Sequence, residues 1–179
     1  MKAKVLGIFF LVCFLFTCCT PKVYFTKDIR NRIESANISL NDIQSYNDRK
    51  VILRRELESG YTKVQSGKVK LENGRYINYI ILGSKTPGIC TNSFTDKLNI
   101  AFESGQGTSL TFGLSPETGN FSRYQIFALQ WTGQIGKIEY DGETYYIQQK
   151  GSGAQLMIKK KVLNKIDVEK RRMKGVRIE

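Results

Sequence analysis

The chain has 179 residues, of which 28 are basic and 16 acidic, so its formal net charge is +12. It contains no histidine, which excludes Ser-His-Asp triads, Cys-His dyads and histidine-ligated zinc or haem sites. Its length suits one domain with a substantial hydrophobic core.

The first residues have the features of a secretion signal. Two lysines, Lys2 and Lys4, precede an apolar run from Val5 to Phe16. A membrane-spanning helix needs about 20 apolar residues, and this run is shorter. A basic start followed by a short apolar segment is typical of a signal peptide, so residues 1–17 are expected to be removed from the mature protein.

The end of this segment, Leu15-Phe16-Thr17-Cys18, resembles the processing site of bacterial lipoproteins. The shared features are a branched apolar residue, a small residue before the cleavage point, and then cysteine. The resemblance implies that Cys18 carries the lipid and that residues 18–25 form a lipidated tether. Because each buried methylene contributes about 0.8 kcal/mol, two or three acyl chains would anchor the protein stably. Cys19 is the competing acceptor, and an ordinary signal peptide is the alternative interpretation.

The expected mature chain remains strongly basic. The 162 residues from Cys18 onward keep 26 basic and all 16 acidic residues, a net charge of +10. This charge predicts contact with an anionic surface, and export from the cytoplasm argues against nucleic acid. No acidic residue precedes Asp28, so we expect attachment to the periplasmic leaflet of the outer membrane. Of the remaining cysteines, Cys19 and Cys90, the second is predicted to be a small buried hydrophobe.

Residues 26–161 are expected to form a short helix followed by a β-domain. Thr26 is placed to cap a helix from Lys27 to Ala36, in which Ile29 and Ile33 share one face. After this helix the apolar residues alternate with a period of two, which is typical of strands. The expected strands are Ile43–Tyr46, Val51–Leu57, Lys63–Leu71, Tyr76–Leu82, Leu98–Phe102, Ser109–Gly113, Tyr124–Trp131, Lys137–Tyr140, Glu143–Gln148 and Gln155–Lys160.

The segments between these strands carry turn signals. Asn73-Gly74 and Asp141-Gly142 predict two tight hairpins, and a turn is also expected at Asn47-Asp48. Thr86-Pro87-Gly88 fits a type II turn. Many short strands at this spacing predict a mainly β fold, either an antiparallel β-sandwich or a small barrel.

Residues 162–179 are expected to be a basic tail. The stretch from Lys159 to Glu179 holds nine basic and three acidic residues. Val162, Leu163, Ile166 and Met173 fit one face of a short helix that ends near Gly175, and a solvated, partly disordered tail is the alternative. Six basic residues are the candidates for contact with an acidic partner: Lys159, Lys160, Lys161, Lys170, Arg171 and Arg172.

The sequence contains no residue pattern that predicts a catalytic, metal-binding or cofactor-binding site. Glu56 and Glu58 resemble a glycosidase carboxylate pair only in their spacing, and they run into a turn. The glycine-rich segments Gly105–Thr108 and Gly151–Gly153 lack the lysine of a phosphate loop and are expected to be hairpin loops. The doublet Tyr145-Tyr146 places one ring on each face of its strand. An exposed tyrosine near Arg and Lys would suit sugar stacking or a protein interface.

Two hypotheses for function remain. The segments Phe25–Arg30, Ile43–Asp48 and Thr86–Cys90 resemble small accessory lipoproteins of contractile, type VI-like secretion systems. This resemblance implies a non-catalytic structural subunit of an envelope-spanning assembly, held by its lipid and by other envelope proteins. The alternative is a periplasmic or surface module that binds a glycan, a lipid or a small ligand. A filled core favours the first hypothesis, and a cavity inside a barrel favours the second.

Overall fold

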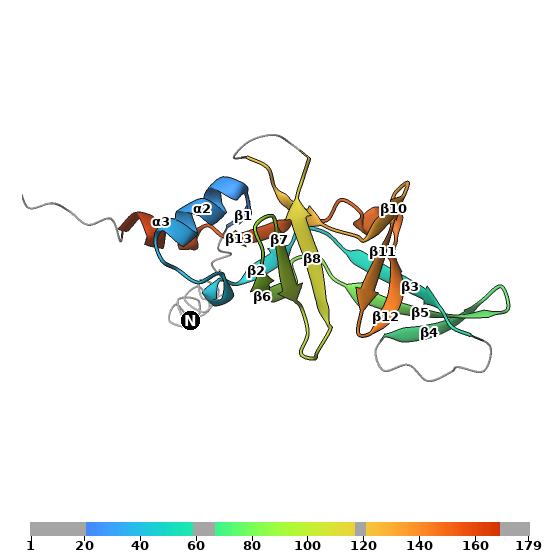
Figure 1. Ribbon diagram of the computed structural model, residues 1–179. Helices are drawn as coiled ribbons and strands as arrows, with labels where there is room; N and C mark the ends of the chain where they lie inside the picture. Colours follow the sequence, from blue (N-terminus) through green and yellow to red (C-terminus); the bar gives the residue numbers. More distant parts are fainter. Residues whose placement is uncertain (1–20, 59–66, 117–120, 169–179) are drawn as a thin grey trace, which may run out of the picture.

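The computed structural model describes residues 21–58, 67–116 and 121–168, which form two antiparallel sheets (Figure 1). The larger sheet has the order β1 (Lys22–Tyr24), β13 (Leu156–Lys159), β2 (Ser45–Asn47), β6 (Pro87–Ser93), β7 (Lys97–Ala101), β8 (Ser109–Leu114) and β9 (Tyr124–Ile126). The smaller sheet has the order β10 (Gln130–Thr132), β11 (Ile135–Tyr140), β12 (Glu143–Ile147), β3 (Val51–Glu56), β5 (Arg75–Leu82) and β4 (Lys68–Glu72). The prediction of a mainly β, antiparallel fold is confirmed. The arrangement is sandwich-like, and the described strands form no closed barrel.

The chain joins the seven-stranded sheet earlier than predicted. Residues 18–25 are expected to be a tether, yet β1 pairs antiparallel with β13 from Lys22 onward. Phe25, directly after β1, is 2% exposed, and its ring centroid lies 5.3 Å from that of Tyr124. Burying a phenylalanine stabilises a fold by about 2 kcal/mol, which favours ordering of this segment. Residues 22–25 therefore belong to the fold and not to a tether.

A helix, α2 (Lys27–Ser35), follows β1 and packs on the seven-stranded sheet. The Thr26 hydroxyl accepts a hydrogen bond from Ile29 N at 3.3 Å, as expected of a residue that caps a helix. Ile29 and Ile33 are buried in the core. Arg30 Nη1 donates to Tyr124 Oη at 2.9 Å, which fixes the helix to β9.

The seven-stranded sheet curls so far that β9, its last strand, approaches the residues next to β1 and β13 at its other edge. Tyr124 N donates to Phe25 O at 3.1 Å, and Ile126 N donates to Ala154 O at 2.8 Å. These contacts are isolated bridges and not a continuous ladder, so the sheet stays open.

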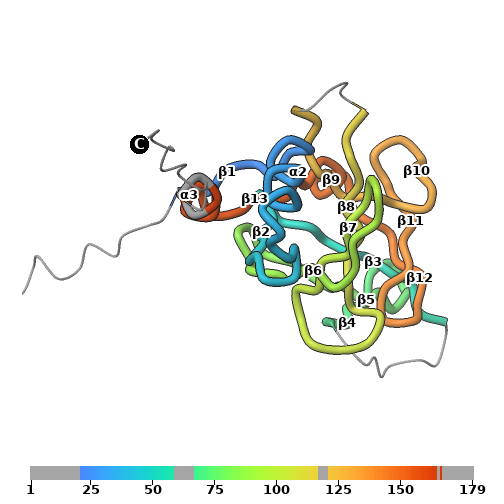
Figure 2. Tube along the Cα trace, turned by 60° about the vertical axis from the view of Figure 1, so that its left-hand side comes forward, coloured from blue at the N-terminus to red at the C-terminus, as the bar shows by residue number. Residues whose placement is uncertain are grey.

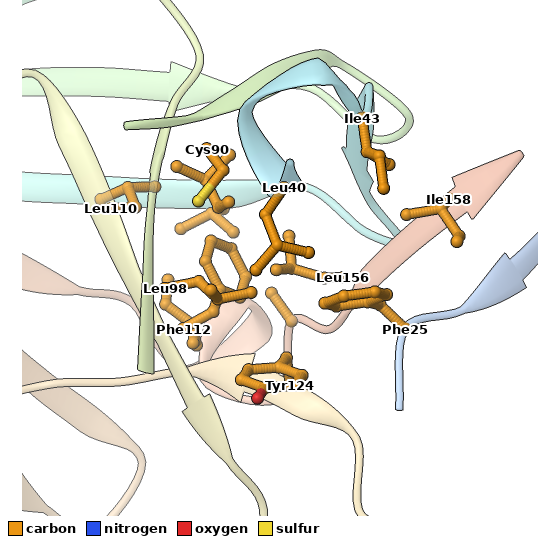
Figure 3. Packing of buried hydrophobic residues seen from close by; sticks show 14 of the residues in the cluster. Phe25, Leu40, Ile43, Cys90, Leu98, Leu110, Phe112, Tyr124, Leu156 and Ile158 are labelled. Carbon is orange, nitrogen blue, oxygen red and sulfur yellow. The ribbon is translucent and has the colours of Figure 1, made fainter. Parts of the chain in front are cut away.

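Apolar side chains fill the interior of this curl (Figure 3). Ten of them are labelled: Phe25, Leu40, Ile43, Cys90, Leu98, Leu110, Phe112, Tyr124, Leu156 and Ile158. Cys90 is a free thiol that is 4% exposed, and burial raises its pKa. The prediction that Cys90 is a packing residue is confirmed.

Both hairpins predicted from their turn residues are confirmed. Asn73 and Gly74 have φ values of 50° and 76°, and Asp141 and Gly142 have values of 53° and 75°. Two successive positive φ angles are the geometry of a type I′ turn. Of the strand predicted from Lys63 to Leu71, residues 63–66 lie outside the described ranges, and the remainder corresponds to β4.

The type II turn predicted at Thr86-Pro87-Gly88 is wrong. The chain enters β6 there, and the residue with positive φ is Lys85 at 61°. A Cβ on Gly88 would lie 2.7–2.8 Å from side-chain atoms of Phe102 and Ile100. The glycine is therefore required for close packing against the core and not for a turn.

Two predicted strand boundaries are also wrong. The segment Tyr124–Trp131 divides into β9 and β10, which belong to different sheets, because Phe127 N bonds Thr111 O and Leu129 N bonds Lys137 O. The segment predicted as a strand from Ile43 instead follows a 3₁₀ turn, η2 (Leu40–Asp42), and pairs only from β2 onward.

Asn47, predicted to form a turn with Asp48, is a buried residue of β2. Its Nδ2 donates to Arg49 O and to Gly83 O, each at 2.6 Å, and its Oδ1 accepts from Thr86 N at 2.9 Å. These bonds satisfy backbone groups of two neighbouring loops, which explains a polar side chain in the interior.

The C-terminal part of the described chain is helical. A 3₁₀ turn, η3 (Gln149–Gly151), leads into β13, and α3 (Lys161–Val168) follows. Ile166 is 7% exposed, and Val162 and Leu163 pack against the core. Residues 161–168 are therefore helical, whereas the rest of the predicted tail, residues 169–179, lies outside the described ranges.

Candidate functional site

The structure brings together only some of the basic residues proposed for partner contact. Lys159, Lys160 and Lys161 are consecutive at the junction of β13 and α3. Lys159 is half-buried with its Nζ 5.8 Å from the Tyr46 ring centroid, whereas Lys160 and Lys161 are exposed. The other three candidates, Lys170, Arg171 and Arg172, and the lipidation site Cys18 lie outside the described residues.

The carboxylates that were considered for catalysis form ion pairs or lie exposed. Glu56 contacts Arg75 at 3.0 Å, and Glu143 contacts Arg55 at 3.1 Å. Glu58 lies beyond the end of β3 and is exposed. The described part of the chain holds no group of three side chains suited to a metal ion.

The glycine-rich segments lie at loops. Residues 105–108 lie in the loop between β7 and β8, and residues 151–153 run from the last residue of η3 toward β13. Neither segment opens an α-helix, so neither has the strand–loop–helix arrangement of a phosphate loop.

The two tyrosines of the doublet occupy opposite faces of the six-stranded sheet, as predicted. Tyr145 is 2% exposed, and its Oη accepts a hydrogen bond from Asn78 Nδ2 at 2.8 Å. Burial raises the pKa of Tyr145, although the nearby Arg55 opposes this effect. Tyr146 is 43% exposed on the outer face of the sheet.

Tyr146 belongs to a line of side chains that crosses every strand of this sheet. The register pairs Gln130 with Lys137, Lys137 with Tyr146, Tyr146 with Arg54, Arg54 with Tyr79 and Tyr79 with Lys68. We call these six residues the cross-strand row. Because strands lie about 4.8 Å apart, the row is about 24 Å long. Its three cations stand on alternate strands, about 10 Å apart.

A depression of about 570 Å³ lies over one end of the cross-strand row. Its lining combines cationic, aromatic, amide and apolar groups: Arg54, Gln130, Thr132, Ile135, Lys137, Tyr146 and Gln148. Guanidinium and ammonium groups bind carboxylates or phosphates, amides bind hydroxyl and carbonyl groups, and a tyrosine ring provides a flat apolar surface.

The positive charge of the row is not compensated by neighbouring carboxylates. Within the described residues, no ion pair joins Arg54, Lys68 or Lys137 to an acidic side chain. Of the acids on the same face, Glu56 binds Arg75, and Glu72 accepts a hydrogen bond from Tyr79 Oη at 2.8 Å. These acids and Glu139 lie on one side of the row, whereas Ile52, Ile81 and Ile135 lie on the other.

A larger cleft of about 780 Å³ separates the two sheets, and several of its polar side chains contact one another or a neighbouring residue. Thr111 Oγ1 donates to Asn99 Oδ1 at 3.0 Å, and Lys97 Nζ lies 4.1 Å from the Phe127 ring centroid. Tyr140 Oη donates to Glu103 at 2.6 Å, and burial together with this bond raises the pKa of Tyr140 strongly. The cross-strand row is the better candidate for binding, since it lies on the outer face of its sheet and its three cations have no acidic partner among the described residues.

Comparison with family models, with curated proteins and with solved structures found no match to this chain. No helix in the described ranges is both long enough and apolar enough to cross a membrane. The geometry of the site is thus the basis for assigning a function.

The sequence indicated that one tyrosine of the Tyr145-Tyr146 doublet is exposed, without distinguishing the two, and the other residues of the row were not predicted. The six strands come from three separate segments of the chain, residues 51–56, 68–82 and 130–147, and only the tyrosine doublet stood out in the sequence. The alternation of Lys68 and Lys70, and of Arg54 and Glu56, was the available signal, since polar residues at every second position mark a solvent-facing side.

Proposed function

We propose that this protein is a non-catalytic structural subunit of a bacterial envelope assembly, anchored by lipid on Cys18 to the periplasmic leaflet of the outer membrane. The cross-strand row carries the proposal, because it lies on the outer face of its sheet and its cations have no acidic partner among the described residues. In this proposal an acidic partner protein docks on the outer face of the six-stranded sheet. A contractile, type VI-like secretion system is the assembly that the sequence resemblance suggests.

The composition of this face supports a protein partner. Tyrosine and arginine are enriched among the residues that dominate protein–protein binding energy. The apolar strip of Ile52, Ile81 and Ile135 runs beside the row, and Ile81 and Ile135 are exposed. A partner with acidic and apolar groups side by side would match both lines of residues.

The packing of the interior also supports a structural subunit. The curl of the seven-stranded sheet is filled by a continuous cluster of buried side chains, from Phe25 and Ile33 to Phe112 and Ile158. A binding module of the barrel type would keep a cavity in this place.

A glycan-binding module is the second candidate, and the spacing within the row favours it. Aromatic rings at Tyr146 and Tyr79 alternate with the cations of Lys137, Arg54 and Lys68. A linear polysaccharide with one carboxylate per disaccharide could place its charges on successive cations and its sugar rings on the tyrosines.

Co-purification from gently solubilised membranes tests the proposal. With the double variant Arg54→Glu, Tyr146→Ala, the amount of co-purified partner protein should fall at least tenfold. The variant reverses one charge and removes the central aromatic contact. Lys27→Glu is the control, since it changes an exposed lysine on α2, far from this face (Figure 1).

The outcomes separate the two candidates. Full recovery of partners by the double variant would contradict docking at this face. If the wild-type protein instead brings down no protein but binds hyaluronan oligosaccharides more tightly than the neutral chitin oligosaccharides, and the double variant does not, the glycan module is correct.

A further inference from the structure

A second basic surface lies where the described chain begins. The outward side chains of β1 and β13 and the start of α3 form it: Lys22, Tyr24, Lys159, Lys160 and Lys161. We call these five residues the anchor face. Lys22 and Lys159 are direct cross-strand partners, and like charges in that position repel each other unless an anion lies nearby.

The anchor face is held next to the proposed lipid. Lys160 N donates to Pro21 O at 2.9 Å, so the first described residue is fixed to the lysine cluster. Only three residue steps separate Pro21 from Cys18, and an extended chain of that length spans at most about 11 Å. Acyl chains on Cys18 would therefore keep the anchor face within reach of the headgroup layer.

Aromatic rings accompany the lysines in this region. Lys22 Nζ lies 4.4 Å from the Tyr46 ring centroid, and Arg123 Cζ lies 4.2 Å from that of Tyr24. Tyrosine is enriched where proteins meet the membrane–water interface. Asp48, at the end of β2, is paired with Arg49 at 2.9 Å and so does not compensate the lysines.

We infer that the anchor face binds anionic phospholipid headgroups and so sets the orientation of the protein on the membrane. This inference rests on the proposed lipid at Cys18, which brings the face to the bilayer. A basic patch beside a lipid anchor adds electrostatic attraction to anionic headgroups, and this attraction favours one orientation of the protein.

Membrane contact at the anchor face would direct the cross-strand row away from the bilayer. β1, β13 and α3 lie at one end of the molecule, and β10, β11 and β12 lie toward the other in both views (Figures 1 and 2). The lipid-proximal end and the partner-docking end are thus separate surfaces of an elongated protein.

Vesicle flotation tests this inference without acylation. The protein is produced without residues 1–17 and with Cys18→Ser. This sample keeps every described helix and strand, because they all lie between residues 22 and 168. It should float with vesicles of phosphatidylcholine and phosphatidylglycerol, but not with phosphatidylcholine alone, and salt should release it. The double variant Lys160→Glu, Lys161→Glu should bind at least about 25-fold more weakly, since each lysine near an anionic surface contributes about fivefold.

The matched control is Lys50→Glu, Lys150→Glu, which changes the net charge by the same amount at two exposed lysines outside both the anchor face and the cross-strand row. Equal loss of binding in both double variants would overturn the inference, because binding would then follow net charge alone. Unchanged binding of the Lys160, Lys161 variant would also overturn it. Neither result affects partner docking at the cross-strand row, which is measured by co-purification.

Discussion

Gly83 and Gly88 lie five residues apart but differ in what a side chain would meet. A Cβ at Gly88 would contact Ile100 and Phe102 at less than 3 Å, whereas the nearest atom to a Cβ at Gly83 is the Thr86 hydroxyl at 3.4 Å. The first glycine lets β6 pack closely on the core, and the second has room for a methyl group. Neither has a positive φ.

Gly88→Ala should destabilise the protein by about 1–3 kcal/mol, because an added methyl group forces the neighbouring core side chains to shift. Gly83→Ala should stay within about 0.5 kcal/mol of wild type. Equilibrium unfolding in urea of the chain without residues 1–17 measures both values. Similar midpoints for the two variants would mean that β6 adjusts without cost.

At the scale of secondary-structure elements, α3 decides where the domain ends. It packs on β13 and α2 through Val162, Leu163 and Ile166, so the fold extends beyond the boundary at residue 161 that the composition suggested. Lys161 in the first turn of α3, and Lys160 just before it, interact unfavourably with the helix dipole, which makes tertiary packing of the apolar face more important.

Deletion of residues 163–179 should destabilise the protein, because it removes Leu163 and Ile166 from the core. Ile166→Ala alone should cost about 2–4 kcal/mol, as expected for truncating a buried isoleucine. Deletion of residues 169–179 is the comparison, and it should leave the midpoint of thermal unfolding close to that of the full mature chain. Equal stability of the two deletions would show that α3 does not support the core.

At the scale of the whole molecule, the proposed function requires that the basic N-terminal end be the membrane-proximal end. The chain reaches this end through Pro21, which is bonded to Lys160, and the six-stranded sheet lies at a distance from it (Figure 1). A lipid on Cys18 would therefore leave the cross-strand row accessible to other envelope proteins.

Cys18→Ser should abolish labelling by a fatty-acid analogue and yield an unprocessed precursor or a soluble periplasmic form. The reason is that serine has no thiol for the thioether bond. Cys19→Ser is the matched control and should be labelled and processed like the wild type. Persistent labelling of the Cys18 variant, or loss of labelling in the Cys19 variant, would place the lipid elsewhere.

The sequence alone determined features that depend on neighbouring residues. Thr26 predicted the start of α2, and Asn73-Gly74 and Asp141-Gly142 predicted two hairpins, because caps and tight turns are formed by local backbone geometry. The alternation at Tyr145 and Tyr146 predicted one buried and one exposed ring for the same reason.

Tertiary structure decided everything that depends on which strands become neighbours. The division of Tyr124–Trp131 between two sheets, the packing role of Gly88 and the buried hydrogen bonds of Asn47 all arise from contacts with distant segments. The cross-strand row is the clearest case. Local turns set the register within the hairpins, such as that of Lys137 with Tyr146. The pairings of β12 with β3 and of β3 with β5, which join the hairpins into one surface, are set by core packing between distant segments.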